Sequence, residues 1–261
     1  MSRYLLRFGA LGYLTVLLLV PVGLVFYRAF QHGIGPAWDA VTTPDARHAF
    51  WLTILIAAIA VPLNTIFGVG LAIGLVRHRF RGRGLVNALV DLPLALSPVV
   101  VGLALFLLYG RGGWLGGLAD HGLRVLFALP GMVLATVFVS LPFVVREVVP
   151  VLREIGTEQE QAAETLGASP FQVFRRITLP AIRWGVAYGV VLTSARAIGE
   201  FGAVSVVSGG IVGQTQTMTL YVQQQFESYD VTGAYAAAVV LALIALGTVL
   251  AMSLFRPTES R

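Results

Sequence analysis

Cysteine and lysine are both absent from the 261 residues, and charged residues of any kind make up only 12% of them. Without cysteine, the chain cannot form a disulfide, a thiolate metal site or a thiol nucleophile. Without lysine, it cannot form the Gly-Lys-Ser/Thr loop that binds the phosphates of ATP. If the chain takes part in ATP-driven work, ATP and Mg must be bound by a separate ATPase, and we expect no cofactor in this chain.

Apolar residues take the place of the missing charges. They account for 57% of the sequence, and the mean hydropathy is +0.82, which is typical of membrane proteins rather than soluble domains. Six apolar runs are long enough to cross a bilayer as helices, at residues 11–30, 50–76, 85–109, 129–149, 184–207 and 233–255. The sequence therefore predicts an all-α membrane protein with six transmembrane helices, the first of which is a retained signal anchor.

The arginines are distributed unevenly between these spans. Thirteen fall on the side of the N-terminal tail, one (Arg196) lies within a span, and four fall on the other side: Arg28, Arg47, Arg111 and Arg124. Because cytoplasmic segments carry the excess of basic residues, we expect both termini in the cytoplasm. The same asymmetry accounts for the net charge of +5 without nucleic acid as a partner.

Two pairs of glycines are spaced four residues apart in the predicted spans, Gly70 with Gly74 and Gly185 with Gly189. Small residues at this spacing let helices approach each other closely. We therefore expect both pairs to pack against neighbouring helices, although such pairs carry no information on a transported substrate.

The fourth loop, residues 157–180, has the sequence TEQEQAAETLGASPFQVFRRITLP and predicts two short helices joined by a sharp turn. Thr157 and Glu160 have the spacing of a capping box, so the first helix is expected to begin there. Gly167 suits the left-handed position that ends a helix.

The second helix of this loop is predicted to begin at Ser169, which has the capping-box spacing with Gln172. Pro180 is expected to end it before the fifth span. One interpretation is an amphipathic helix pair resting on the membrane surface. A helix-turn-helix that binds DNA is disfavoured by the spans on either side and by the few basic residues.

The same segment resembles the coupling loop of ABC-importer permeases, whose pattern is Glu-Ala-Ala, three residues, Gly, nine residues, then Ile-x-Leu-Pro. Gln161 stands where the family has Glu, and the matching positions are Ala162, Ala163, Gly167, Ile177, Leu179 and Pro180. The resemblance implies a type I ABC-importer permease fold whose loop docks on a cytoplasmic ATPase. The residues it implies for that contact are Glu160, Gln161, Ala162, Ala163, Glu164, Leu166, Gly167, Ala168, Ser169 and Phe171.

Other segments are similar to the sulfate/thiosulfate permease family, in particular to its W-type membrane subunit. They are FWLTILIAAIAVPLNTIFG (50–68), DLPLALSPVVVGL (91–103), LPFVVREVVP (141–150) and ARAIGEFGAVSVVSG (195–209). This similarity implies a heterodimer with a sister permease, two ATPase subunits and a periplasmic sulfate-binding protein at the bacterial inner membrane. Molybdate and tungstate permeases share the Arg-x-x-Gly-Glu-Phe-Gly pattern of the fifth span and are the alternative.

The chain is accordingly divided into two parts. Residues 1–47 form the N-terminal span and the first periplasmic loop. Residues 48–256 form a permease core that contains the coupling loop.

Three ionisable residues lie at membrane depth, Asp91, Arg196 and Glu200, where each needs a partner or water. One hypothesis places Arg196 on the path of a dianion. The other neutralises Arg196 with Glu200, which lies four residues away on the same helix face, or with Asp91. We favour the second, because two carboxylates near one arginine repel an anion.

The third span is expected to be broken, since it contains Pro93, Pro98 and Gly102. Broken helices usually line a cavity in a membrane protein. Asp91 is predicted to cap the helix that resumes after the break, and Ser97 to offer its hydroxyl to an oxyanion. The translocation path is thus predicted to involve Asp91, Ser97, Arg196 and Glu200, whereas Arg146 is expected to snorkel to the interface.

Three rival classes fit this sequence less well. An intramembrane enzyme needs a Ser–His pair or a metal cluster at membrane depth, but the histidines fall in loops or at their edges: His32, His48, His78 and His121. A secondary anion transporter has no need of a capped coupling loop and often shows a repeated half. A scaffolding protein has no use for intramembrane charges. We therefore predict a transport subunit rather than an enzyme.

Overall fold

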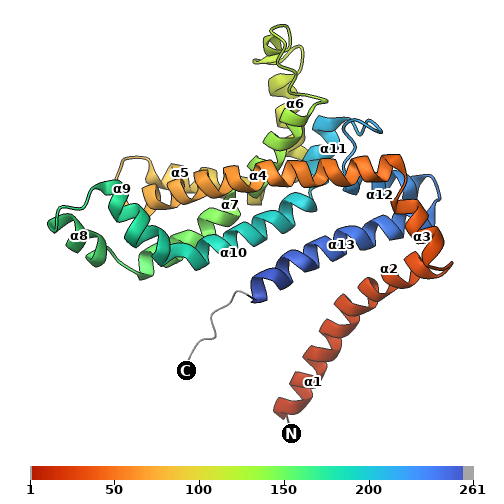
Figure 1. The fold of residues 1–261 in the computed structure, drawn as a ribbon, viewed down its shortest axis with the longest axis horizontal. Coiled ribbons are helices and arrows are strands. Elements are labelled where there is room, and N and C mark those ends of the chain that lie inside the picture. Colours follow the sequence, from red (N-terminus) through yellow and green to blue (C-terminus); the bar gives the residue numbers. More distant parts are fainter. Residues whose placement is uncertain (1, 255–261) are drawn as a thin grey trace.

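The computed structural model describes residues 2–254, which form helices and loops without a strand. Phe255 at the predicted end of the sixth span, and Arg256 and Arg261 of the tail, lie outside the described residues, as does the end of the predicted 48–256 core. Within the described part, most helices run along one direction, with α8 and α9 at one end of the molecule and α3 and α12 near the other (Figure 1).

The helices follow in the order α1 (Ser2–Leu14), a π-helical turn η1 (Thr15–Leu19), α2 (Val20–Phe30), α3 (Ile34–Val41), α4 (Pro44–Arg77), α5 (Arg83–Ala95), α6 (Pro98–Tyr109), a 3-10 turn η2 (Gly116–Leu118) and α7 (Leu129–Glu154). They continue with α8 (Glu158–Thr165), α9 (Pro170–Val173), a π-helical turn η3 (Phe174–Thr178), α10 (Leu179–Ile198), α11 (Gly202–Ser208), α12 (Met218–Glu227) and α13 (Val231–Leu254).

The six predicted spans correspond to continuous helices and bent helix pairs. Four segments of the described chain are long and apolar enough to cross a membrane alone: Arg7–Phe30, Pro44–Arg77, Leu129–Glu154 and Val231–Thr248. The other two predicted spans correspond to bent helix pairs, α5 with α6 at 111° and Pro170–Ile198 with α11 at 52°, each long and apolar enough to cross a membrane if its two halves form one span. The chain is therefore an all-α, multi-pass membrane protein.

Helix α7 lies in the core of the bundle, and it packs against both α4 and α10. Glycines make this packing close: a Cβ on Gly68 of α4 would lie 2.8 Å from the Cβ of Val144, and one on Gly189 of α10 would lie 2.8 Å from the Cα of Val144. Val144 is fully buried between them. Because neither neighbour has a side chain at this point, the three helices interlock as one body.

The two predicted glycine pairs fare differently. Gly185 and Gly189 both face α7, as predicted, whereas a Cβ on Gly70 or Gly74 would meet no described atom within 4 Å. The expectation for Gly70 and Gly74 is therefore wrong within the described chain, because they lie on a face of α4 that this bundle leaves uncovered. Gly68, two residues earlier, makes the close contact instead.

Buried polar side chains add hydrogen bonds between the helices. Asn64 of α4 donates through Nδ2 to Oγ of Ser140 in α7 at 2.8 Å. Thr53 of α4 accepts a hydrogen bond from the backbone N–H of Met218, the first residue of α12, at 2.9 Å. Buried hydrogen bonds of this kind hold helices in register where apolar side chains alone would allow sliding.

The third span breaks at Leu96 and Ser97, within the segment where the sequence predicts a break. Leu96 (φ −89°, ψ 142°) and Ser97 (φ −63°, ψ 136°) are both extended, which is usual for Ser97 because it directly precedes Pro98, the first residue of α6. Asp91 does not cap the second half: it lies inside α5, five residues before the break, and Ser97 takes the N-cap position instead. The prediction for Asp91 as a cap is thus wrong, because α5 continues through Pro93.

The fifth span also breaks, where the sequence predicts one continuous helix over residues 184–207. Helix α10 ends at Ile198, and α11 begins at Gly202 after a short non-helical stretch. The Glu200 carboxylate accepts a hydrogen bond from the backbone N–H of Ala203 at 2.8 Å, which satisfies one free donor at the start of α11. The apolar composition of the span conceals this break.

The N-terminal helical segment diverges from the bundle (Figure 1). None of the most apolar window of Arg7–Phe30 is buried by the described chain, and its C-terminal part, α2, packs on α13. The first predicted span is thus helical but contributes little to the core.

Candidate functional site

The predicted coupling segment forms a helical hairpin at one end of the molecule, made of α8 and α9 (Figure 1). Helix α8 ends at the predicted glycine: Gly167 has φ +83°, and its N–H bonds to the carbonyl of Glu164 at 2.9 Å. The N–H of Ala168 bonds to the carbonyl of Ala163 at 3.0 Å. This pairing satisfies carbonyls that would otherwise lack partners at the helix end.

The two predicted capping boxes have different outcomes. Ser169 and Gln172 form theirs, with the N–H of Ser169 donating to Oε1 of Gln172 at 2.8 Å and the N–H of Gln172 donating to Oγ of Ser169 at 3.4 Å. Thr157 occupies the N-cap position of α8, but its side chain makes no capping bond. The first box is therefore wrong, because Glu160 bonds to other groups.

The second helix of the hairpin does not stop before the fifth span. Residues 170–198 are helical throughout, from α9 through the π-helical turn η3 into α10. Pro180 lies in the first turn of α10 rather than after a helix. Pro180 lacks the N–H that would donate a hydrogen bond within the helix. The π-helical turn η3 just before it accommodates this loss, so the helix widens at this point and does not end.

The predicted coupling residues form a largely exposed surface around the turn of the hairpin. Ala163 and Ala168 are half-buried, and the exposed members are Gln161, Ala162, Glu164, Leu166, Gly167, Ser169 and Phe171. Leu166 and Phe171 are large apolar side chains on this surface. Exposed apolar groups beside acidic and amide groups are typical of a docking surface for another protein.

Glu160, also predicted to contact the ATPase, points into the chain. Its Oε2 lies 2.8 Å from Nε of Arg77, the last residue of α4, and Oγ1 of Thr178 donates to its Oε1 at 2.6 Å. Arg77 donates in turn through Nη1 to the backbone carbonyl of Leu152 in α7 at 3.0 Å. Sequence reasoning missed this cluster, because Arg77 is the first of several arginines in one loop and nothing distinguishes it from the others.

Arg196 and Glu200, two of the predicted path residues, form the expected ion pair. Nη1 of Arg196 lies 2.7 Å from Oε2 of Glu200, and the side chains are 29% and 1% exposed. The carboxylate is therefore almost completely removed from solvent, while the guanidinium keeps partial access. This geometry matches the interpretation in which Glu200 neutralises Arg196.

Asp91 pairs with Arg146 of α7 rather than with Arg196. Nε of Arg146 donates to Oδ1 of Asp91 at 2.7 Å, and Nη2 contacts Oδ2, so the pair is bidentate. Both side chains remain partly exposed. The ion pair with Asp91 was not predicted from the sequence, and the position of Arg146 at the membrane interface stays a prediction. Ser97 is exposed at the bend, and its side chain does not cap α6.

The predicted path residues thus lie in two separate clusters. Among the described residues, no ion pair joins Asp91 and Arg146 to Arg196 and Glu200. Glu147 lies next to Arg146 and is also partly exposed. Because each arginine faces at least one carboxylate, neither cluster carries a net positive charge that attracts an anion.

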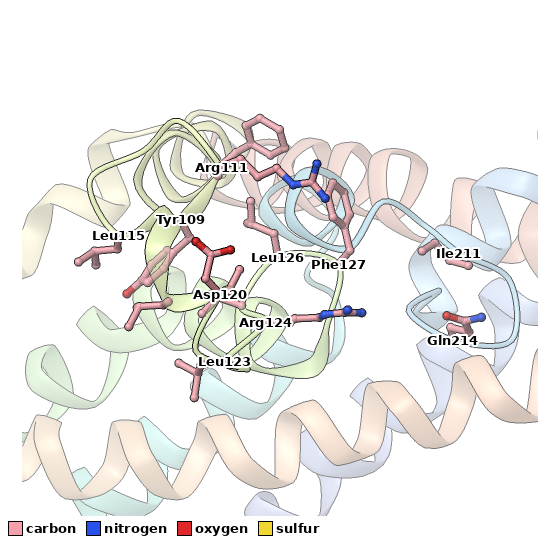
Figure 2. Close-up of a pocket in the computed structure, with 15 residues that line it drawn as sticks. Tyr109, Arg111, Leu115, Asp120, Leu123, Arg124, Leu126, Phe127, Ile211 and Gln214 are labelled. Atoms are coloured by element: carbon pink, nitrogen blue, oxygen red, sulfur yellow. The ribbon is translucent and has the colours of Figure 1, made fainter.

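A cavity of about 790 Å³ opens at the loop between α6 and α7, facing the loop that follows α11. Figure 2 shows Arg111, Asp120 and Arg124 around it, with Ile211 and Gln214 on the opposite loop. Phe127 has φ +55° and its ring lies 6.2 Å from that of Phe106 in an edge-on contact. From the sequence, Arg111 and Arg124 could only be placed in a loop, because a cavity between two loops leaves no local pattern.

Comparison with known proteins identifies relatives along nearly the whole chain. Residues 64–258 match the family described as "Binding-protein-dependent transport system inner membrane component". The sulfate transport system permease protein CysW of Synechocystis sp. is 52% identical over 94% of this chain and 90% of its own length. That of Escherichia coli (strain K12) is 50% identical, over 92% and 83%. The protein CysT of Salmonella typhimurium is 39% identical, over 89% and 84%.

Solved structures share the fold at low sequence identity. A chain of a bacterial ABC transporter that imports the acidic polysaccharide alginate superposes with a TM-score of 0.81 at 17% identity, over 97% of this chain and 93% of that one. A second structure of an alginate transporter, in complex with a periplasmic protein bound to an alginate pentasaccharide, gives a TM-score of 0.78 at 19% identity, over 96% and 92%. The chain thus has the fold of an ABC-importer permease.

Proposed function

The chain belongs to the family of binding-protein-dependent transport system inner membrane components, and we propose that it is a permease subunit of an ATP-driven importer of sulfate or thiosulfate. The observation that carries this proposal is the exposed hairpin at residues 157–180, whose turn is stabilised by the left-handed Gly167 and by the Ser169 capping box. The chain that presents this hairpin is similar to sulfate permease proteins. A transport subunit that is driven by a separate ATPase needs a docking element of this kind, whereas a secondary transporter does not.

The proposed complex contains chains that supply what this one lacks. Two ATPase subunits bind ATP and Mg, since this chain has no lysine for a phosphate-binding loop. A sister permease completes the membrane part as a heterodimer, and a periplasmic sulfate-binding protein delivers the anion. A structural neighbour described with a periplasmic protein bound supports the last of these partners.

The proposed location is the bacterial inner membrane, surrounded by lipid, with both termini and the hairpin in the cytoplasm. The arginine distribution supports this orientation, because the loop that carries the hairpin is rich in arginine and the loop over residues 208–232 has none. The large cavity between the α6–α7 loop and the loop after α11 then lies on the periplasmic side. Nucleic acid has no part in this proposal.

The ATPase contact is proposed for the exposed face of the hairpin. Gln161, Leu166 and Phe171 are accessible to a partner there. Gly167 lies at the centre of this face and has no described atom within 4 Å of a built Cβ. A large side chain at Gly167 therefore meets no atom of the bundle, but the φ of +83° strains any such residue, so it impairs docking both by its bulk and by distorting the turn of the hairpin.

For the translocation path, the geometry supports a positioning role for the charged residues. Arg196 lies in the last turn of α10 and Glu200 lies within the break between α10 and α11, where its carboxylate also accepts a hydrogen bond from the first turn of α11. We infer that this pair fixes the bend. Asp91 and Ser97 lie on the exposed side of the other bend and stay candidates for the wall of the path.

A molybdate or tungstate importer is the second candidate, because the fifth span carries the Arg-x-x-Gly-Glu-Phe-Gly pattern at residues 196–202. The two candidates are separated by measuring the ATPase activity of the purified complex in liposomes. Binding protein loaded with sulfate is compared with the same protein loaded with molybdate, each with and without Gly167→Arg.

Stimulation by sulfate alone, lost on Gly167→Arg, is the expected result. Stimulation by molybdate moves the protein to the second candidate. Full stimulation in Gly167→Arg contradicts the proposed coupling surface. Gly167→Asn is the matched control, because asparagine tolerates the left-handed conformation and adds little bulk.

A further inference from the structure

Helix α8 is attached to the bundle with little apolar packing. None of its residues is buried. The connections at its two ends contain glycines in the left-handed conformation, Gly156 with φ +64° and Gly167 with φ +83°. A cavity of about 470 Å³ lies beside α8, and the residues that line it include Arg77, Glu160, Gln161, Phe174 and Thr178. A helix held this way tilts independently of the spans unless specific contacts fix it.

Such a contact exists on the inner face of α8, where Glu160 meets Arg77. The carboxylate lies 2.8 Å from Nε of Arg77 and also accepts from Nη2 at 3.4 Å. Thr178 donates to the same carboxylate, and Arg77 donates to the carbonyl of Leu152. The side chains of Arg77 and Glu160 are only 12% and 15% exposed, so water competes little for these bonds.

We propose that this cluster carries displacement of α8 directly into the ends of α4, α7 and the η3–α10 helix. We call it the Arg77 clamp, and its members are Arg77, Glu160, Thr178 and the carbonyl of Leu152. The inference rests on the proposed function, in which an ATPase moves α8. A planar guanidinium with several bonds holds its partners in one orientation, unlike a single flexible contact.

The helices that the clamp joins are those that interlock around Val144. Gly68 of α4 and Gly189 of α10 both pack on this residue of α7. Force applied to α8 thus enters a body of three packed helices rather than one flexible helix. Arg77 and Glu160 are positioning residues in this account, since they bind the rest of the chain and not the ATPase or the substrate.

The first test uses Arg77→Gln and Glu160→Gln in the complete complex, reconstituted in liposomes with its binding protein loaded with sulfate. ATP hydrolysis and uptake of labelled sulfate are measured on the same preparation. We expect ATP hydrolysis to persist while uptake per ATP hydrolysed falls about tenfold, because removing a charge-assisted hydrogen bond shifts the equilibrium between held and released α8 by about that factor. Arg79→Gln is the control, because Arg79 is exposed and outside the clamp, and its ratio should match that of the unmodified protein.

The second test restores the link chemically. Because the chain has no cysteine, the double variant Arg77→Cys with Glu160→Cys places the chain's only thiols at the clamp. We expect it to hydrolyse ATP with little uptake, to regain uptake after treatment with a short bis-methanethiosulfonate cross-linker, and to lose it again on reduction. Each single cysteine variant, treated identically, should stay uncoupled.

The outcomes separate the clamp from its alternatives. If Glu160→Gln lowers the uptake per ATP hydrolysed and Arg77→Gln does not, Glu160 acts at the ATPase surface and the proposed role of the clamp is wrong. If both variants fail to assemble, the pair serves folding and the proposal is overturned. If the unmodified complex shows no uptake stimulated by the binding protein, the proposed function fails, independently of the clamp.

Discussion

Replacing Arg196 with methionine removes the guanidinium from a carboxylate that is almost inaccessible to solvent. Glu200 is 1% exposed, and its other oxygen already accepts the N–H of Ala203. Breaking a buried ion pair by removing one partner costs about 3–5 kcal/mol, because the remaining charge is left uncompensated. At roughly 2–4 °C per kcal/mol, this lowers the apparent Tm by roughly 6–20 °C.

The reverse change is predicted to be milder. Glu200→Gln keeps an oxygen that accepts from Ala203, and the Arg196 side chain it leaves behind is 29% exposed and can be hydrated. We expect a loss of about 1–2 kcal/mol. The double variant Arg196→Met with Glu200→Gln has no buried charge at this site and should recover about half or more of the loss seen in Arg196→Met.

Thermal unfolding of the detergent-purified chain measures these three variants, and sulfate uptake is recorded in parallel. The order of stability should be Glu200→Gln above Arg196→Met, with the double variant above Arg196→Met as well. A double variant as unstable as Arg196→Met would refute charge neutralisation as the role of the pair. A fully stable Arg196→Met that has lost uptake would instead place Arg196 on the path of the anion.

Three further variants test the helix packing and one buried hydrogen bond between helices. Gly189→Ala places a Cβ 2.8 Å from the backbone of Val144 and should destabilise the chain by about 1–3 kcal/mol. Gly70→Ala has open space around its Cβ, so it should be neutral or slightly stabilising in the same thermal assay. Thr53→Val removes the oxygen that accepts the N–H of Met218; leaving this buried donor unpaired should cost about 1–3 kcal/mol, and equal Tm values for the variant and the parent would contradict that role.

Local patterns in the sequence predicted the features that depend on nearby residues. The apolar runs located all the spans, Gly167 and the Ser169 box located the turn of the hairpin, and the four-residue spacing of Arg196 and Glu200 predicted their ion pair. Each of these is determined within a few helical turns. The chemistry of the short segment is therefore sufficient to predict it.

Features that depend on distant residues were missed or misassigned. Glu160 was assigned to a capping box and to a partner protein, but Arg77, far away in the sequence, holds it. The pairing of Arg146 with Asp91 on another helix was not predicted at all. One sequence contains many arginines that could pair with either carboxylate, and only the packing of the helices selects among them.

Uptake by proteoliposomes measures directly whether an external ATPase drives this chain through its hairpin. Labelled sulfate and loaded binding protein are supplied outside, ATP is enclosed with the ATPase side, and the parent complex is compared with Gly167→Arg. The account predicts ATP-dependent accumulation in the parent and none in Gly167→Arg, with Gly167→Asn close to the parent. Accumulation that continues without ATP, or that is unaffected by Gly167→Arg, would contradict the claim that an external ATPase drives this chain through its hairpin.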